Sequence, residues 1–444
     1  MSSPATPAPN SAIRRVPLPE GTLPVGFALL VAGAATYGFF KVGEVALGEQ
    51  EFKPIMAMWF ATFFLAPGFF LPVEQELGRA LSQRKALGQG GLPVVRRIVV
   101  LGGVITSVVV AAMLIASPVI TEEYFDGNWW MMAALITAFV SYAPAHLARG
   151  VCAGMGRFRS YAFVMGADGV IRIIACITLA VIGITAAAPY AFAVALSPLV
   201  AVIIVRSKGQ LHTNPGPPAR WNEVTQNLGW LLVGTVFAAA LLNAGPVAVN
   251  LLADDSETDL VVWFGFGVLL ARIPLFLFQA VQAALLPRLA RLAARGEFNE
   301  FRSGLTKLMQ LVIAVGVVGT VGAFLIGPFA VETVYNAQLS GRTLAMLALS
   351  SALYMAGLAT AQAVIALHGH ALVALGWSVG VAGFLIGTWL SSDLLFRRIE
   401  IGLVVSSSAA LVCFVTALRF KLRTGAAPTS DSVMDAITDM PFET

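Results

Sequence analysis

Two similar stretches, FFLPVEQELGRAL (69–81) and AALLPRLARLAARGEF (283–298), decide how this chain is organised. Each one ends an apolar segment and leads through a basic loop into a second apolar segment. Those second segments also end alike, in ASPVITEEYFDGN (116–128) and IGPFAVETVYNAQ (326–338). Because the matching prolines and glutamates lie about half the chain apart, the spacing predicts an internal repeat of two similar halves.

The composition assigns both halves to a membrane. Of the 444 residues, 58% are hydrophobic and 12% are charged, and the mean hydropathy is +0.82. Soluble domains carry about 25% charged residues, and a soluble fold has too little interior to bury so many apolar side chains. A soluble enzyme, a nucleic-acid binder and a disordered regulator are therefore excluded. The three cysteines show no pairing pattern, so neither a disulfide framework nor a metal site is expected, and no cofactor is expected.

Twelve apolar stretches are long enough to cross a bilayer as helices, which takes about 20 residues each. They cover residues 22–43, 54–73, 95–117, 128–150, 161–185, 188–205, 226–250, 260–286, 306–329, 342–367, 371–391 and 401–420. Together with the repeat they predict an all-α membrane protein of two parallel six-helix lobes. The predicted parts are disordered cytoplasmic tails at 1–21 and 421–444, lobes at 22–205 and 226–420, and a cytoplasmic linker at 206–225.

The basic residues indicate which side of the membrane each loop faces. Lys and Arg are enriched in cytoplasmic loops, and most of the 28 in this chain fall in the tails and alternate loops on one side. The opposite loops are acidic, as in the run Asp254, Asp255, Glu257 and Asp259, and only the pair Arg397–Arg398 opposes this orientation. Both termini are therefore expected in the cytoplasm.

Charges at mid-membrane depth point to transport, because a scaffold does not need them. Arg272 lies near the middle of the stretch 260–286, where an arginine costs about 2.5–3.5 kcal/mol, so it should face a wet cavity or a partner. Pro274 favours a kink beside it. Gln279, seven residues on, can share its face, and Gln282 continues the polar interruption.

Asp168 and Arg172 are spaced i, i+4 in the fifth stretch, which allows an ion pair on one helix face. The pair is either a self-neutralised structural element or a part of the cavity wall, and the corresponding positions of the second half are apolar. Asn243, near Gly245–Pro246, marks a kinked seventh helix that is expected to line the cavity. Two arginines and one aspartate predict a mildly cationic cavity suited to an anionic group, since guanidinium matches phosphate well.

Further polar residues lie at the inner ends of the second and fourth helices. Glu74, Glu76 and Arg79 follow Pro72 and form either a solvated helix end or an inner gate at the cytoplasmic entrance. His146 and Arg149 are expected to contact lipid headgroups or to belong to the same gate.

Three stretches resemble the bacterial polysaccharide or lipid-linked oligosaccharide flippases (Wzx-type) of the multidrug/oligosaccharidyl-lipid/polysaccharide (MOP) exporter superfamily. They are LARGVCAGMGRFRSYAFV (147–164), LLARIPLFLFQAVQAALLPRLARLAARGEFNEF (269–301) and PGFFLPVEQELGRAL (67–81). The resemblance implies two six-helix lobes in a V, cargo bound between them, and alternating access. Related lipid II flippases are similar in carrying an arginine in helix 8 that helps to bind an anionic headgroup, and Arg272 is the matching type of residue.

The resemblance therefore implies a non-enzymatic flippase in the bacterial plasma membrane, which moves a polyprenyl-phosphate-linked oligosaccharide or polysaccharide precursor to the outer leaflet. Its expected partners are that lipid-linked sugar, membrane lipids, and a glycan polymerase or glycosyltransferases, and a monomer is expected. One alternative is a MATE-type drug/cation antiporter on the same frame, with Asp168 as its carboxylate. The other is a membrane glycosyltransferase or polymerase, which the short outer loops disfavour.

Overall fold

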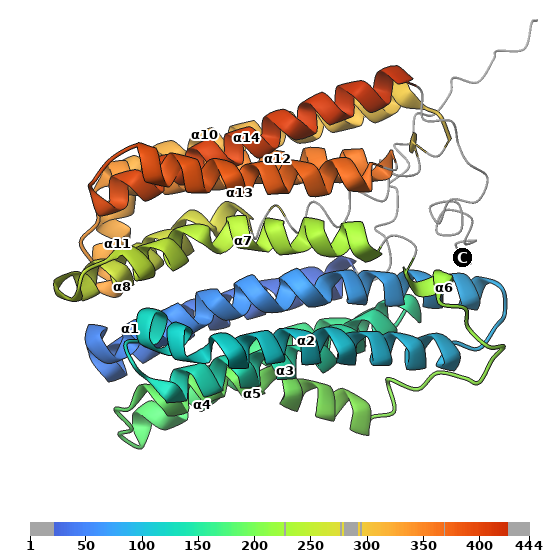
Figure 1. The fold of residues 1–444 in the computed structure, drawn as a ribbon, viewed down its shortest axis with the longest axis horizontal. Coiled ribbons are helices and arrows are strands. Elements are labelled where there is room, and N and C mark those ends of the chain that lie inside the picture. The colour runs from blue at the N-terminus through green and yellow to red at the C-terminus, as the bar shows by residue number, and fades with distance from the viewer. Residues whose placement is uncertain are drawn as a thin grey trace, which may run out of the picture.

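The computed structural model describes residues 22–225, 228–275, 278, 292–293, 295–367 and 369–424. All the long elements within these ranges are helices, and they run side by side along one axis (Figure 1). Eleven of the helices are long and apolar enough to cross a membrane. The first of them contains two of the twelve predicted stretches, so the predicted all-helical architecture with twelve crossings is confirmed.

The first five long helices form the N-terminal lobe, and one of them is a hairpin. Helix α1 (Thr22–Ala86) contains a break at Gly48, whose φ of 73° and ψ of 170° favour glycine. The two halves of α1 run back alongside each other, so that Phe39 stacks on Trp59 with 5.7 Å between ring centroids. Helical structure on both sides of Gly48 replaces the outer loop expected at 44–53. The lobe is completed by α2 (Leu92–Phe125), α3 (Trp129–Gly154), α4 (Phe158–Val181) and α5 (Ala187–Ser207).

The remaining helices form the C-terminal lobe. Helix α7 (Leu228–Leu252) is followed by the short η1 (Asp255–Glu257) and by α8 (Thr258–Ala271). Helix α8 ends at Ala271, and residues 273–275 are helical again beyond this break, where Pro274 lacks the N–H that would continue the hydrogen-bond ladder. Most of the predicted segment beyond residue 275 lies outside the described residues. The rest of the lobe consists of α10 (Phe298–Leu325), α11 (Gly327–Tyr335), α12 (Gly341–Ala366), α13 (His370–Leu390) and α14 (Leu395–Thr424).

The segment between the lobes packs against the N-terminal lobe. It ends in the short helix α6 (Asn222–Thr225), and its Ala219 and Val224 share a buried apolar cluster with Val73 and Leu77 of α1. We call the end of the molecule that carries this segment the linker end, and the end that carries Gly48, η1 and α11 the distal end (Figure 1). The prediction assigns residues 421–424 to a disordered tail, but in the structure they form the end of α14. Residues 1–21 and 425–444 lie outside the described ranges.

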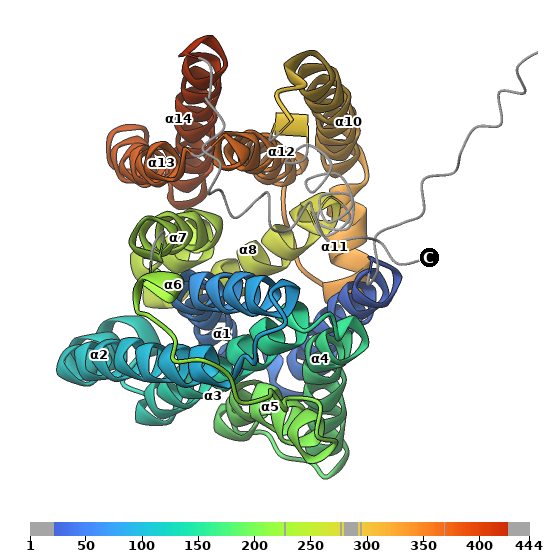
Figure 2. The same ribbon diagram turned by 90° about the vertical axis from the view of Figure 1, so that its right-hand side faces the viewer.

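Seen along the helix axes, α7 and α8 form the side of the C-terminal lobe that faces α1 (Figure 2). The second half of α1 packs on α7, where a Cβ added to Gly68 would lie 3.2 Å from the Cα of Val236. It also meets α8 so closely that a Cβ on Gly265 would clash with the Met56 sulfur. The hairpin α1 therefore contributes much of the N-terminal lobe's contact with the other lobe, and α2 adds the Tyr124 carbonyl, which accepts a hydrogen bond from Asn250 of α7 at 2.9 Å.

Candidate functional site

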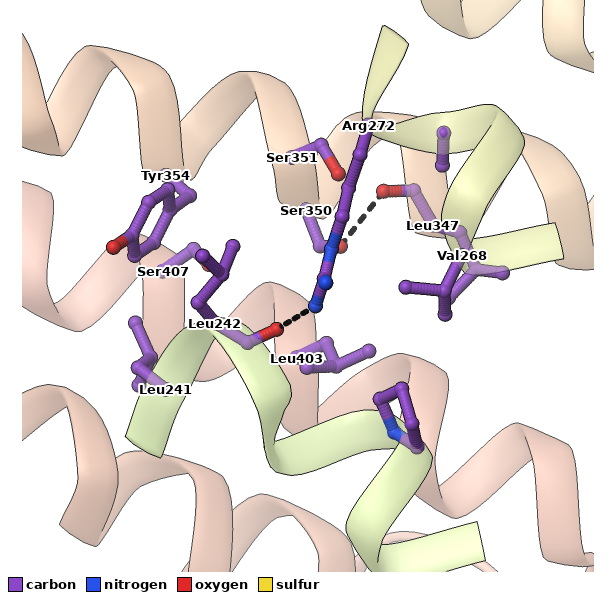
Figure 3. Close-up of a pocket in the computed structure, with 12 residues that line it drawn as sticks. Leu241, Leu242, Val268, Arg272, Leu347, Ser350, Ser351, Tyr354, Leu403 and Ser407 are labelled. Carbon is purple, nitrogen blue, oxygen red and sulfur yellow. Dashed lines mark hydrogen bonds between the residues drawn. The ribbon is translucent and has the colours of Figure 1, made fainter. Parts of the chain in front are cut away.

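A pocket in the C-terminal lobe is built around Arg272. It contains about 370 Å³ of free space, part of it open to the surroundings. Its walls come from α7, the end of α8, α12 and α14, and Figure 3 shows the Arg272 side chain extending between the serines of α12 and Leu242. The pocket is lined by Leu241, Leu242, Pro246, Val268, Ala271, Arg272, Leu347, Ser350, Ser351, Tyr354, Leu403 and Ser407.

The break after α8 positions the Arg272 guanidinium. Arg272 is the C-cap residue of α8, with φ of −91° and ψ of −5°. Its side chain projects from the end of this helix, between Asn243 of α7 and Phe60 of α1. It donates from Nη1 to the Asn243 side-chain oxygen at 3.3 Å and from Nη2 to the Leu242 carbonyl. Its Cζ lies 5.4 Å from the ring centroid of Phe60 in the other lobe.

The charge of Arg272 has no carboxylate partner among the described residues. Both hydrogen-bond acceptors are neutral amide oxygens, and the residue is only 9% exposed. A guanidinium has five N–H donors, so three remain after these two bonds. Of the pocket hydroxyls, Ser350 donates to the Leu347 carbonyl and Tyr354 to the Ala238 carbonyl. A buried cation without a counter-charge makes this pocket attractive to an anion.

A second polar group lies inside the N-terminal lobe. The predicted pair is present, with Arg172 Nη1 3.7 Å from the Asp168 carboxylate. Arg172 also donates to Thr36 at 3.2 Å and lies over the Trp59 ring at 4.5 Å. It is 2% exposed, and its Nε and Nη1 have no hydrogen-bond partner in the described part of the chain.

Asp168 is held by hydroxyl groups as well as by Arg172. Tyr142 of α3 donates to it at 3.2 Å and Ser197 of α5 at 2.5 Å. The carboxylate therefore connects three helices of the lobe. This arrangement leaves both readings of the Asp168–Arg172 pair open, because it serves packing and also places a charge beside the α1 hairpin.

The structure separates the remaining predicted cavity residues. Asn243 lies beside Arg272 and also donates to the Phe63 carbonyl of α1 at 3.2 Å, so it joins the two lobes. Gln279 and Gln282 lie outside the described residues. Arg172 contacts α1 on a different face from Arg272, so the four described charged and amide groups do not share one pocket.

The predicted solvated helix end is wrong, because Glu74 and Glu76 are buried, with exposed fractions of 5% and 2%. Glu74 accepts two hydrogen bonds from Arg149, at 2.8 and 3.0 Å, and one from Tyr161 at 2.9 Å, and His146 Nδ1 lies 2.8 Å away. The headgroup reading of His146 and Arg149 is wrong for the same reason. A buried carboxylate needs such donors, and these residues connect α1, α3 and α4.

The remaining predicted gate residue, Arg79, holds the linker together with Arg84. Arg79 binds the Glu76 carboxylate at 2.8 Å and also the Glu223 carbonyl of α6. Arg84, which the sequence analysis did not select, binds the Glu223 carboxylate at 3.0 Å and the Pro217 carbonyl at 2.8 Å. These contacts fix the linker to the N-terminal lobe rather than to the space between the lobes.

Aromatic side chains join the lobes towards the distal end. The Phe266 ring of α8 stacks on Tyr335 at 4.1 Å and on Phe52 of α1 at 6.2 Å. Near them Trp263 donates to Glu49 at 2.7 Å. Within the described residues, the hydrogen bonds and ring contacts from the first half of α1 to the other lobe begin only at Tyr37. The described contacts therefore close the distal end.

Sequence reasoning missed the residues that hold the two arginines. Thr36, Trp59 and Tyr142 surround Arg172 and its aspartate, and Phe60 lies against Arg272. Their only signal was that Trp59 and Phe60 are adjacent aromatic residues in a helix that carries no charge at that depth. Adjacent residues of a helix point about 100° apart, which is how one helix can serve both arginines.

No known protein-family profile matches the chain, and no curated protein matches it. Solved structures do match. An inward-facing multidrug resistance MATE family transporter of the MOP superfamily has a TM-score of 0.67 at 12% identity, over 94% of this chain and 96% of that one. A MATE transporter in the bent conformation gives 0.65 at 12% identity, over 92% and 97%. A mutant of the Vibrio cholerae MATE transporter VcmN gives 0.64 at 16% identity, over 91% and 97%.

These likenesses confirm the predicted fold class, the two-lobed fold of MATE transporters. At 12–16% identity they show the fold alone, and they do not single out the Wzx-type flippases.

Proposed function

We propose that this chain is a transporter of the bacterial plasma membrane that works by alternating access and catalyses no covalent reaction. Two lobes of similar architecture that meet along α1, α7 and α8 support this proposal, as does the fold shared with MATE transporters. The basic loops place the linker end in the cytoplasm under the positive-inside rule. The distal contacts around Phe266 then correspond to closure on the outer side.

We propose that the cargo carries an anionic group, and the observation that carries this proposal is the uncompensated charge of Arg272. The guanidinium is buried, its acceptors among the described residues are all neutral, and it lies at the lobe interface beside a pocket. A polyprenyl-phosphate-linked oligosaccharide or polysaccharide precursor fits these features. Its phosphate would bind Arg272 while its lipid tail stays in the bilayer.

The second candidate is a MATE-type drug/cation antiporter. The names of the solved neighbours favour it more directly than they favour a flippase. Such an exporter needs a carboxylate that can release a cation or a proton, and Asp168 is the candidate. Its present hydrogen bonds from Tyr142 and Ser197 and its ion pair with Arg172 would have to be exchanged during transport.

Reconstituted protein distinguishes the two candidates. Proteoliposomes are supplied either with a fluorescent polyprenyl-pyrophosphate-linked disaccharide or with ethidium under a proton or sodium gradient. For the first candidate, Arg272→Ala should slow flipping by about tenfold or more, because a hydrogen bond to a charged group contributes about 1.5–3 kcal/mol. The exposed distal Arg397 provides the matched control, Arg397→Ala, which should flip normally.

Arg272→Lys should restore little, since an ammonium cannot reproduce the planar fork. Ethidium transport that depends on Asp168, with no flipping of the lipid-linked sugar, would support the antiporter and refute the flippase.

A further inference from the structure

In each half of α1, one residue contacts Arg172 and the next residue contacts Arg272 or the carbonyl beside it. In the first half of α1, Thr36 accepts a hydrogen bond from Arg172, and the next residue, Tyr37, donates to the Leu269 carbonyl beside Arg272 at 2.7 Å. In the second half, Trp59 lies under Arg172 and the next residue, Phe60, lies under Arg272. Each half of the hairpin therefore touches one arginine group on one face and the other on the adjacent face.

This arrangement makes the hairpin a rigid connection. The Phe39–Trp59 stack and the contact of Phe40 with Trp59, at 5.0 Å, hold the two halves together. Trp59 and Phe60 are buried, with 5% and 1% exposure, so neither ring can turn without displacing neighbours. A helix rotation that moves Trp59 relative to Arg172 must move Phe60 relative to Arg272 as well.

The Leu269 carbonyl strengthens the link on the C-terminal side. It accepts both the Tyr37 hydroxyl and the backbone N–H of Arg272, the latter at 3.2 Å. The Asn243 amide, whose oxygen binds Arg272, donates to the Phe63 carbonyl of the same hairpin. The position of the Arg272 guanidinium is thus set from both halves of α1.

We propose that the Asp168–Arg172 pair controls the Arg272 pocket through α1, with Thr36, Tyr37, Trp59 and Phe60 as positioning residues. A change at the pair, such as loss of the Asp168 charge, shifts the hairpin and opens or closes the pocket in the other lobe. This assigns the pair a regulatory role in which it need not touch the cargo. The proposal rests on the proposed function only in taking the Arg272 pocket as the cargo site.

The test measures the state of the pocket without any cargo. Ser351 lines the pocket and is partly exposed, so Ser351→Cys is introduced into full-length protein that lacks its three native cysteines. The probes are the anionic and the cationic ethyl methanethiosulfonates, and the measured quantity is the labelling rate of each. In the parent protein the anionic reagent should react faster, because of Arg272.

Trp59→Leu should raise the labelling rate by about fivefold or more, in the range of ordinary allosteric couplings. Trp59→Phe, which keeps a ring under Arg172, should stay close to the parent. The control is Phe70→Leu, a fully buried ring of the same half of α1 that contacts Phe139 at 4.7 Å and neither arginine. Asp168→Asn should act in the same direction as Trp59→Leu and should be non-additive with it.

Thr36→Val removes a single hydroxyl and provides a milder variant if Trp59→Leu does not fold; it should also raise the rate. Unchanged rates in the folded Trp59, Thr36 and Asp168 variants would overturn the proposal, as would an equal increase in Phe70→Leu. Failure of this test leaves the flipping assay unaffected. Failure of flipping with the labelling pattern intact would instead refute the cargo and retain the coupling.

Discussion

The buried carboxylate of Glu74 should be among the most destabilising positions to neutralise. Arg149 donates to it from Nε and Nη2 at 3.0 and 2.8 Å, and Tyr161 and His146 complete its surroundings. The variant Glu74→Gln keeps the shape and leaves the Arg149 charge without a partner. Breaking a buried ion pair on one side costs about 3–5 kcal/mol. Because the Arg149 side chain is 15% exposed, we expect the lower end, about 3 kcal/mol.

The measurement is the apparent free energy of unfolding in mixed micelles, titrated with sodium dodecyl sulfate and followed by tryptophan fluorescence. The matched control is Glu44→Gln, since Glu44 pairs at 3.2 Å with Lys41, whose side chain is 41% exposed. A pair of this kind contributes at most about 1 kcal/mol.

Adding Arg149→Met to Glu74→Gln should recover at least half of the loss, because replacing both members of a buried pair removes the unpaired charge. A loss in Glu74→Gln no larger than in Glu44→Gln would refute the reasoning. So would a double variant less stable than the single one.

Two further predictions concern the contacts between lobe, linker and hairpin. A disulfide formed by Met56→Cys with Gly265→Cys should lock the lobes together, because a Cβ on Gly265 would meet the Met56 side chain. Transport should stop on oxidation and return with reductant. Transport by the oxidised, fully cross-linked protein would contradict this prediction. Arg84→Ala should release the linker, since Arg84 binds both Glu223 and the Pro217 carbonyl. Limited proteolysis between residues 208 and 221 should then accelerate, whereas Lys85→Ala, at an exposed neighbour, should leave the cleavage rate unchanged.

The sequence predicts the membrane class, the crossings and the repeat because these depend on composition and periodicity, which are local properties. It places the turn between the first two crossings at 44–53, where charged residues such as Glu49 and Glu51 interrupt the apolar pattern, but it does not show that helix continues up to Gly48 on both sides. It also misassigns Glu74 and Glu76. The partners of Glu74, Arg149 and Tyr161, are distant in the chain. Glu76 pairs with Arg79 on its own helix, but the linker carbonyl that Arg79 also binds, that of Glu223, is distant as well.

The candidate site divides in the same way. Arg272, Arg172 and Asp168 stand out because a charge in an apolar stretch is rare. The neutral groups that hold Arg272 do not stand out in the sequence. The Leu242 group is a backbone carbonyl, which every residue has, and Asn243 is selected only for its place near a kink. The aromatic contacts of Trp59 and Phe60 depend on which helices become neighbours, and that is settled by tertiary packing.

The size of the Arg272 pocket limits how this protein could discriminate between cargoes. Its free space of about 370 Å³ includes open space, and its cavity volume is only about 30 Å³, far below the roughly 300–1,000 Å³ found for pockets that hold drug-sized ligands. Only one small charged group of a large molecule would fit there, and the rest would stay in contact with lipid or water. The protein would then bind its cargo through that one charged group. Under the proposed flippase function, molecules that share this charged group and differ in their distant sugars would be bound alike, so a change in the glycan would require no change in the pocket.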